Sequence, residues 1–353
     1  MREKMNLELS VQDIVDDMRI GWNLGNSLEV PAPENEEGAS LEDYETTWLN
    51  PVTTKEMILE IVKAGFNTIR IPVTWWKLMK KEEPYEVNPA WLDRVQEVVD
   101  YAYNEGIYVI IDVHHEDDWL YLGNSEVEEK AKVILEKLWV QIAEHFKDYG
   151  ERLLFETMNE TRLIGTEYEW NEGTPEARRT INEFNKIALR AIRSTGGNNL
   201  HRIVMIKSIG ARYNVESIRD VEVPDNDKRV LLAVHAYVPY PFTMVAGEAE
   251  YWGTEEDKKE LSEMFDGIAS TAKKIGVPAI IGEFGLIDKH NEDVRVGYVS
   301  YFVSEARKRG ISCVVWDNNI TFERNPDLCY QIFDRENLTW KFPRIVKALM
   351  DNA

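Results

Sequence analysis

The sequence contains few cysteines: only Cys313 and Cys329 in 353 residues. Two cysteines do not make the disulfide framework that stabilises small secreted domains. Cys313 lies in an apolar run at residues 311–315, where a buried free thiol is the usual state, and a disulfide between the two cysteines is the alternative. The fold must therefore rest on a hydrophobic core, and a chain of this length with 44% hydrophobic residues is large enough to form one.

Long hydrophobic runs are also missing. No stretch approaches 18 apolar residues without charges, so the sequence predicts no transmembrane helix and no membrane association. Residues 1–8 contain no apolar run of the kind that forms the centre of a signal peptide. Two interpretations stay open, a cytoplasmic protein or a secreted protein whose targeting segment is absent from this sequence.

Positive charge is scarce. The chain has 41 Lys and Arg against 63 Asp and Glu, which gives a net charge of −22. Such acidity argues against nucleic acid and anionic membrane surfaces as partners, whereas a neutral ligand is not repelled. Aromatic residues are plentiful, with 11 Trp, 15 Tyr and 11 Phe. They fit either core packing or, for a few of them, platforms on which a flat ligand stacks.

No Pro-, Gly- or Ser-rich linker divides the chain, and one pattern recurs along it. Short runs rich in β-branched residues alternate with amphipathic charged stretches, and the runs are typical of parallel strands buried on both faces. We expect strands at residues 19–24, 66–72, 107–114, 153–160, 202–209, 230–237, 278–285 and 312–319, and helices at residues 53–64, 89–104, 126–147, 175–194, 215–218, 255–274, 292–309 and 343–350. The alternation predicts an α/β fold, a single (β/α)8 TIM barrel, as one domain over residues 1–353 with its core at about 19–350.

Polar or aromatic residues end seven of the eight predicted strands. This matters because the active site of a (β/α)8 barrel lies at the C-terminal ends of its strands. The candidate site residues are Asn26 and Glu29, Arg70, His114 and His115, Asn159 and Glu160, His235 and Tyr237, Glu283, and Trp316 and Asn318.

Glu160 and Glu283 are the strongest candidates for catalysis, because each follows an apolar strand where an unpaired carboxylate is costly. A carboxylate taken alone fits a structural ion pair as well. Arg70 also lies within an apolar strand and is the natural partner of one glutamate, which it would keep ionised. One ionised and one protonated glutamate form the pair that retaining glycoside cleavage requires.

Other kinds of site find little support. Adjacent histidines on a strand, such as His114 and His115, point to opposite faces and cannot both bind one metal ion without a bend. A metal-dependent amidohydrolase therefore remains only as an alternative. The sequence has no Gly-rich phosphate-binding pattern and no Gly-x-Ser-x-Gly nucleophile turn, so we expect neither metal nor cofactor.

Seven short motifs follow one another across nearly the whole chain: GWNLGN (21–26), GFNTIRIP (65–72), HH (114–115), MNE (158–160), HAY (235–237), IGEFG (281–285) and WDNN (316–319). In this order they resemble glycoside hydrolase family 5, and most of all its subfamily 4 endoglucanases. The resemblance implies a retaining endo-β-1,4-glucanase that needs no metal. It also implies that Glu160 is the general acid/base and Glu283 the nucleophile.

The resemblance implies roles for the other candidates too. Arg70 and Tyr237 hold the nucleophile, Asn159 contacts the sugar 2-hydroxyl, and Trp316 is the platform under the sugar. His114, His115 and His235 line the cleavage subsite, with His235 near the acid/base, while Asn26 and Glu29 bind outer hydroxyl groups. Several loop aromatics are placed where side branches of a substrate would be met, namely Trp119, Tyr121, Tyr240, Phe242 and Trp252.

One residue departs from the family pattern. The family usually has proline after the Asn-Glu pair, but this chain has Thr161, which loosens the turn without removing a reacting group. Asn159 thereby becomes a formal N-glycosylation site, and a glycan there would block the predicted active site. We therefore expect an unglycosylated bacterial protein. We also expect it to be secreted and to act as a monomer on a β-glucan polysaccharide.

The substrate stays open at this stage. Cellulose, mixed-linkage glucan and xyloglucan all fit, and the narrower alternatives are a xyloglucan-specific endoglucanase or a broad glucanase and xylanase. A carbohydrate-binding barrel without catalysis is a hypothesis of another class. It would be expected to lose one of the two glutamates, and both are present.

Overall fold

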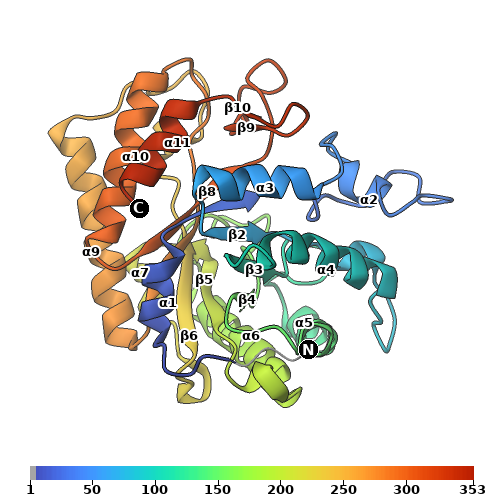
Figure 1. The fold of residues 1–353 in the computed structure, drawn as a ribbon. Helices are drawn as coiled ribbons and strands as arrows, with labels where there is room; N and C mark the ends of the chain where they lie inside the picture. Colours follow the sequence, from blue (N-terminus) through green and yellow to red (C-terminus); the bar gives the residue numbers. More distant parts are fainter. Residues whose placement is uncertain (1–4) are drawn as a thin grey trace.

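A closed barrel of eight parallel strands forms the centre of the computed structural model, which describes residues 5–353 (Figure 1). The strands follow one another around the barrel in chain order, and β8 pairs with β1 to close it. Their bounds are β1 Ile20–Leu24, β2 Thr68–Ile71, β3 Tyr108–Asp112, β4 Leu153–Glu156, β5 Val204–Arg212, β6 Val230–His235, β7 Ala279–Phe284 and β8 Ser312–Asp317. This arrangement confirms the predicted (β/α)8 barrel.

The strands are buried on both faces. On β3, Tyr108 and Ile110 belong to the core cluster inside the barrel, whereas Val109 and Ile111 belong to the cluster between the strands and the surrounding helices. This alternation follows from the strand itself, in which successive side chains point to opposite faces. Burial on both sides explains why the strand sequences are almost continuously apolar.

Helices surround the barrel, and each helix expected from the sequence is present with its ends within two residues of the prediction. The larger helices are α3 Lys55–Ala64, α4 Pro89–Tyr103, α5 Ser125–His145, α6 Pro175–Ser194, α9 Glu255–Ile275, α10 Glu292–Arg307 and α11 Pro343–Asp351. The short ones are α2 Asp43–Thr46, α7 Val215–Ile218 and α8 Tyr240–Thr243, with 3₁₀ turns at Trp76–Leu78, Gly197–Leu200 and Pro224–Asn226. In the part of the chain that the structure describes, no helix is long and apolar enough to cross a membrane.

Helix α3 shows how local sequence sets these bounds. The Thr54 side chain accepts a hydrogen bond from the backbone N–H of Met57, which satisfies one of the free donors at the start of the helix. Gly65 ends the helix at φ +105°, a left-handed conformation that glycine adopts without strain. Met57, Ile58 and Ile61 form the buried face.

Several elements were not expected from the sequence. The N-terminal helix α1, Val11–Met18, places Val11, Ile14, Val15 and Met18 in the core cluster inside the barrel. A small hairpin, β9 Phe333–Asp334 and β10 Thr339–Trp340, follows the barrel. Cys313 and Cys329 are both buried free thiols, so the disulfide alternative is not realised.

Six of the eight predicted strands extend too far at their C-terminal ends, whereas β1 ends as predicted and β5 continues three residues further than predicted, to Arg212. Strand β4 ends at Glu156, so Asn159 and Glu160 lie in the segment that follows it. These residues leave the sheet and turn over the mouth of the barrel, where side chains from different strands can meet.

Candidate active site

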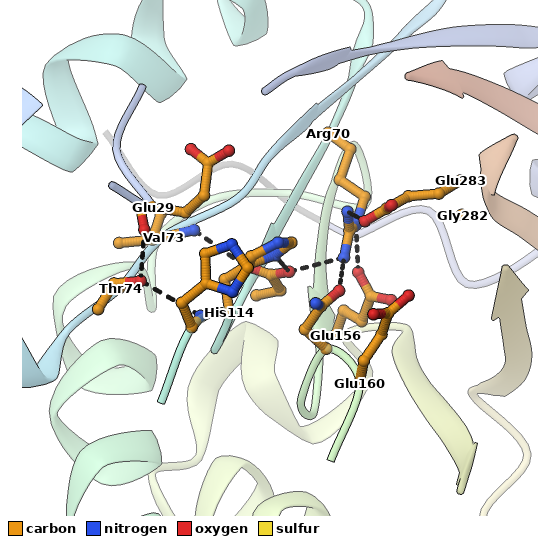
Figure 2. Close-up of polar contacts among 12 residues, drawn as sticks. Glu29, Arg70, Val73, Thr74, His114, Glu156, Glu160, Gly282 and Glu283 are labelled. Carbon is orange, nitrogen blue, oxygen red and sulfur yellow. Dashed lines mark hydrogen bonds and ion pairs between the residues drawn. The ribbon is translucent and has the colours of Figure 1, made fainter. Parts of the chain in front are cut away.

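Buried charged side chains meet at the C-terminal ends of the strands, and Arg70 on β2 is at their centre (Figure 2). Its guanidinium donates to Glu283 from Nη1 at 2.6 Å, to Glu156 from Nε at 2.6 Å and to Asp112 from Nη2 at 2.7 Å. It also donates to Oδ1 of Asn159 at 2.8 Å. A guanidinium carries its donors in one rigid plane, so Arg70 sets the relative positions of these side chains.

The two predicted catalytic glutamates lie close together. One carboxylate oxygen of Glu160, one of Glu283 and a ring nitrogen of His235 all lie within 4.8 Å of one another. His235 Nδ1 is 2.6 Å from Glu160 Oε1 and 3.6 Å from Glu283 Oε2. The Tyr237 hydroxyl donates to Glu283 Oε2 at 3.0 Å. This spacing is compatible with the separation of about 5–5.5 Å between the two carboxyl groups of a retaining glycosidase.

The two carboxyl groups have different electrostatic surroundings. Burial, followed by the neighbouring charge of Glu283, raises the pKa of Glu160 to about 8. Burial also raises the pKa of Glu283, but the positive charges of Arg70 and Lys207 and the hydrogen bond from Tyr237 oppose that rise. Of the two carboxyl groups, Glu283 therefore has the stronger support for its ionised form, and Glu160 is the one that keeps its proton at neutral pH.

Lys207, on β5, connects the Arg70 group to His235. Its ammonium group donates to Glu156 Oε1 at 2.5 Å and lies 3.0 Å from His235 Nε2. Glu156 uses its other oxygen to accept from Arg70, so one buried carboxylate binds two buried cations. Pairing of this kind offsets the desolvation of charges that are completely enclosed.

Glu160, His235 and Glu283 are the one group within residues 5–353 whose donor atoms could surround a metal ion. These atoms already contact one another, and Glu283 is further bound by Arg70. The buried cations Arg70 and Lys207 would repel a metal ion at this position. The residues therefore do not fit a metal centre, which disfavours the amidohydrolase alternative.

A cavity of about 430 Å³ adjoins this group. His115 lines it and contacts the ring of His114, with 4.5 Å between the ring centroids. Trp48 and Trp76 also line the cavity and supply flat apolar surfaces. The cavity thus places aromatic surfaces beside His115, next to the histidine that contacts Asp112.

Residues 32–321 match the sequence model of the cellulase family, described as glycosyl hydrolase family 5, and this match covers more than half of the chain. The chain belongs to glycosyl hydrolase family 5. The family predicted from the seven sequence motifs is therefore confirmed.

Relatives in family 5 match along almost the whole chain. Endoglucanase A of Clostridium longisporum is 44% identical over 97% of this chain, which spans 65% of the length of that relative. A solved GH5-4 broad specificity endoglucanase from the same species is 43% identical, covers 98% of both chains and has a TM-score of 0.93. A xyloglucan-specific endo-beta-1,4-glucanase from a metagenomic library, solved in complex with cellotriose, is 38% identical over 97% of this chain and 99% of its own, with a TM-score of 0.91.

Many of the predicted site residues lie together in this family 5 chain. Glu160, Glu283, Arg70, Asn159, His235 and Tyr237 form one hydrogen-bonded group. Nδ1 of His114 lies within hydrogen-bond distance of Asp112 Oδ2, at 2.6 Å. Its ring lies nearly parallel to that of Trp316, with 6.3 Å between centroids and 7° between planes. His115 lies at the edge of the group, in the wall of the adjoining cavity.

Two residues predicted to bind or support the substrate, Glu29 and Asn318, use their polar atoms within the protein. Glu29 is completely buried, and its carboxylate accepts backbone N–H groups of Asn26 and Ser27. Asn318 donates to the carbonyl of Leu328 and accepts from the backbone N–H of Ile320. These contacts fit a role in holding the loops together better than the predicted role in binding substrate. Asn26 itself is 8% exposed, in the turn after β1.

The loop aromatics divide by exposure. Trp119 is 4% exposed, and its ring N–H donates to Glu116 at 2.6 Å. Phe242 and Trp252 are also buried, whereas Tyr240 is 61% exposed. Packing in the loops therefore accounts for Trp119, Phe242 and Trp252, which cannot meet the side branches of a substrate.

Sequence reasoning missed Asp112, Glu156 and Lys207, all completely buried beside Arg70 or His235. The signal that identified Arg70 was available for each of them, because each is a charged residue in an apolar strand. A buried charge requires a partner, so these three residues could have been predicted as partners of the site.

Proposed function

We propose that this chain is a retaining endo-β-1,4-glucanase that hydrolyses plant cell-wall glucans such as cellulose, mixed-linkage glucan and xyloglucan. The observation that carries the proposal is the pair Glu160 and Glu283, with oxygens within 4.8 Å and different electrostatic surroundings. The names of the family 5 relatives support the substrate class.

The reaction follows a double displacement. In the first step the Glu283 carboxylate attacks the anomeric carbon, and the bond from that carbon to the glycosidic oxygen breaks as Glu160 gives its proton to the departing oxygen. In the second step Glu160, now ionised, removes a proton from water. The water oxygen bonds to the anomeric carbon and releases Glu283 as a carboxylate.

Neighbouring residues would hold the sugar and the nucleophile. Because Arg70 has only donors, it must face the carbonyl oxygen of the Asn159 side chain, which turns the amide nitrogen of Asn159 away from it. That nitrogen is available to donate to a sugar hydroxyl. Trp316 and His114 offer adjacent, nearly parallel ring surfaces. A neutral glucan is compatible with the strongly acidic chain, since it carries no charge to be repelled.

A xyloglucan-specific enzyme is the second candidate, because one solved relative has that specificity. The burial of Trp119, Phe242 and Trp252 removes three of the aromatics that could have met xylose branches. A polymeric substrate does not cross a cell membrane, so we place the action of this protein outside the cell. We expect residues 1–353 to act as one catalytic domain and as a monomer.

Side-by-side digestion tests the proposal. Carboxymethylcellulose, barley mixed-linkage glucan, xyloglucan and xylan are incubated with the protein, with and without EDTA, and product sizes are followed over time. We expect EDTA-insensitive release of mixed oligosaccharides from at least one glucan. Release that EDTA abolishes would favour metal-dependent hydrolysis, and binding without release would favour a carbohydrate-binding barrel. A Glu283→Gln preparation controls for contaminating glucanases.

A further inference from the structure

Lys207 forms its hydrogen bonds with Glu156 and His235 rather than with Glu160 or Glu283, and it is completely buried beside these two glutamates. Its ammonium group donates to Glu156 at 2.5 Å. The same ammonium lies 3.0 Å from Nε2 of His235. An ammonium group has three N–H donors and no acceptor, so the contact with Nε2 requires an unprotonated ring nitrogen.

This contact decides where His235 carries its hydrogen. With Nε2 occupied as an acceptor, a neutral imidazole must carry its hydrogen on Nδ1. Nδ1 lies 2.6 Å from Glu160 Oε1, so the ring donates to that oxygen. Burial, together with the positive charges of Lys207 and Arg70, holds the pKa of His235 well below its ordinary value, which keeps the ring neutral.

The arrangement also decides where Glu160 carries its proton. Its Oε1 accepts from His235, so the acidic proton belongs on Oε2, the oxygen that does not face the histidine. After the proton has been transferred, the same Nδ1–H group stabilises the carboxylate that remains. Charged and titratable groups face His235 from several parts of the barrel, namely Lys207, Glu160, Glu283, Arg70 and His114.

We propose that Lys207 is a positioning residue for the acid/base. By donating to Nε2 of His235, it fixes the tautomer of the ring that carries its hydrogen on Nδ1. That N–H group then occupies Oε1 of Glu160 and leaves the transferable proton on Oε2. This inference rests on the proposed function, since it concerns the acid step of glycoside cleavage. The hydrogen bonds of the two cations differ accordingly, since Arg70 donates directly to Glu283, whereas Lys207 reaches Glu160 through His235.

Substrates with different leaving groups test the proposal in Lys207→Met and Lys207→Arg. The dinitrophenolate released from 2,4-dinitrophenyl β-cellobioside departs without being protonated. The phenolate of phenyl β-cellobioside is a poorer leaving group and must receive a proton, so only this second substrate depends on the acid. For Lys207→Met we expect kcat/KM to fall at least about tenfold on phenyl β-cellobioside and less than about threefold on 2,4-dinitrophenyl β-cellobioside. Lys207→Arg should recover part of the loss. Equal losses on both substrates would overturn the proposal, and Lys259→Met, an exposed lysine on α9, is the matched control.

Nitrogen NMR of ¹⁵N-histidine-labelled wild-type protein tests the tautomer without any assay of activity. We expect the His235 resonances, identified by their loss in His235→Gln, to show a protonated Nδ1 and an unprotonated Nε2. A hydrogen on Nε2 would overturn the proposal. If the wild-type protein cleaved neither cellobioside, the proposed function would fail, and the NMR result would still decide the role of Lys207.

Discussion

At the scale of single residues, Glu283 and Glu160 are distinguished by what surrounds them. Arg70 and Tyr237 bind Glu283 directly, whereas Glu160 receives its hydrogen bond from a neutral histidine. Neither glutamate could be assigned a protonation state from sequence position alone. The difference depends on side chains that three other strands, β2, β5 and β6, bring to the same place.

Replacing Glu283 by Gln should lower kcat at least about 10³-fold, because the amide cannot form the glycosyl-enzyme. The change keeps the shape of the side chain, so circular dichroism and the melting temperature should show a folded protein. The assay is initial-rate hydrolysis of the best glucan. Activity near that of the wild type would contradict the assignment of the nucleophile.

Because Glu160 must be protonated to act as the acid, we expect its titration to set the alkaline limb of the pH profile of activity. Its pKa is raised to about 8, so the general acid is protonated below that pH and loses its proton as the pH rises through it. We expect kcat/KM on a substrate with a poor leaving group to fall above about pH 8. The check is a pH–rate profile at constant ionic strength. A limb near the ordinary glutamate pKa of 4.5 would show that burial does not act on this group as described.

At the scale of elements, the β9–β10 hairpin is attached to the barrel mouth through Arg335. This buried side chain donates to the carbonyl groups of Gly25, which follows β1, and of Asp317, which ends β8. It also forms an ion pair with the Asp317 carboxylate at 3.4 Å. The hairpin was not predicted because its strands have only two residues each, too short for any periodic pattern.

Arg335→Met should lower the free energy of unfolding by about 3–5 kcal/mol, because it leaves buried Asp317 without its ion-pair partner. Urea denaturation at neutral pH measures the effect. Arg344→Met is the matched control, since its ion pair with Asp293 is exposed and should contribute little to stability. Equal effects of the two substitutions would contradict the role of Arg335.

At the scale of the whole molecule, the barrel was predictable because its signals repeat. Eight apolar runs separated by amphipathic segments leave few alternative architectures. The same reasoning missed α1, although its Ser10 cap and the helical spacing of its buried apolar residues are local signals that the sequence contains. It failed in part for the site, where Glu29 and Trp119 have the residue types of a binding site but are enclosed by their own loops.

The net charge of −22 belongs to the molecule as a whole and predicts a dependence of stability on salt. Like charges repel in the compact state, and raising NaCl from about 10 mM to about 150 mM shortens the screening length from about 30 to about 8 Å. We expect Tm at pH 7 to rise by several degrees over this range. The effect should shrink near the pI of about 4.8, and an equal rise at both pH values would contradict the charge explanation.

The most direct test of the central claim is to trap the glycosyl-enzyme. Incubation with 2,4-dinitrophenyl 2-deoxy-2-fluoro-β-cellobioside, whose fluorine slows release of the intermediate, is followed by intact and peptide mass spectrometry. A retaining mechanism with Glu283 as nucleophile predicts one fluorocellobiosyl group per chain, on the peptide that contains Glu283 and absent from Glu283→Gln. A label on another residue, or inactivation without any label, would contradict the claim.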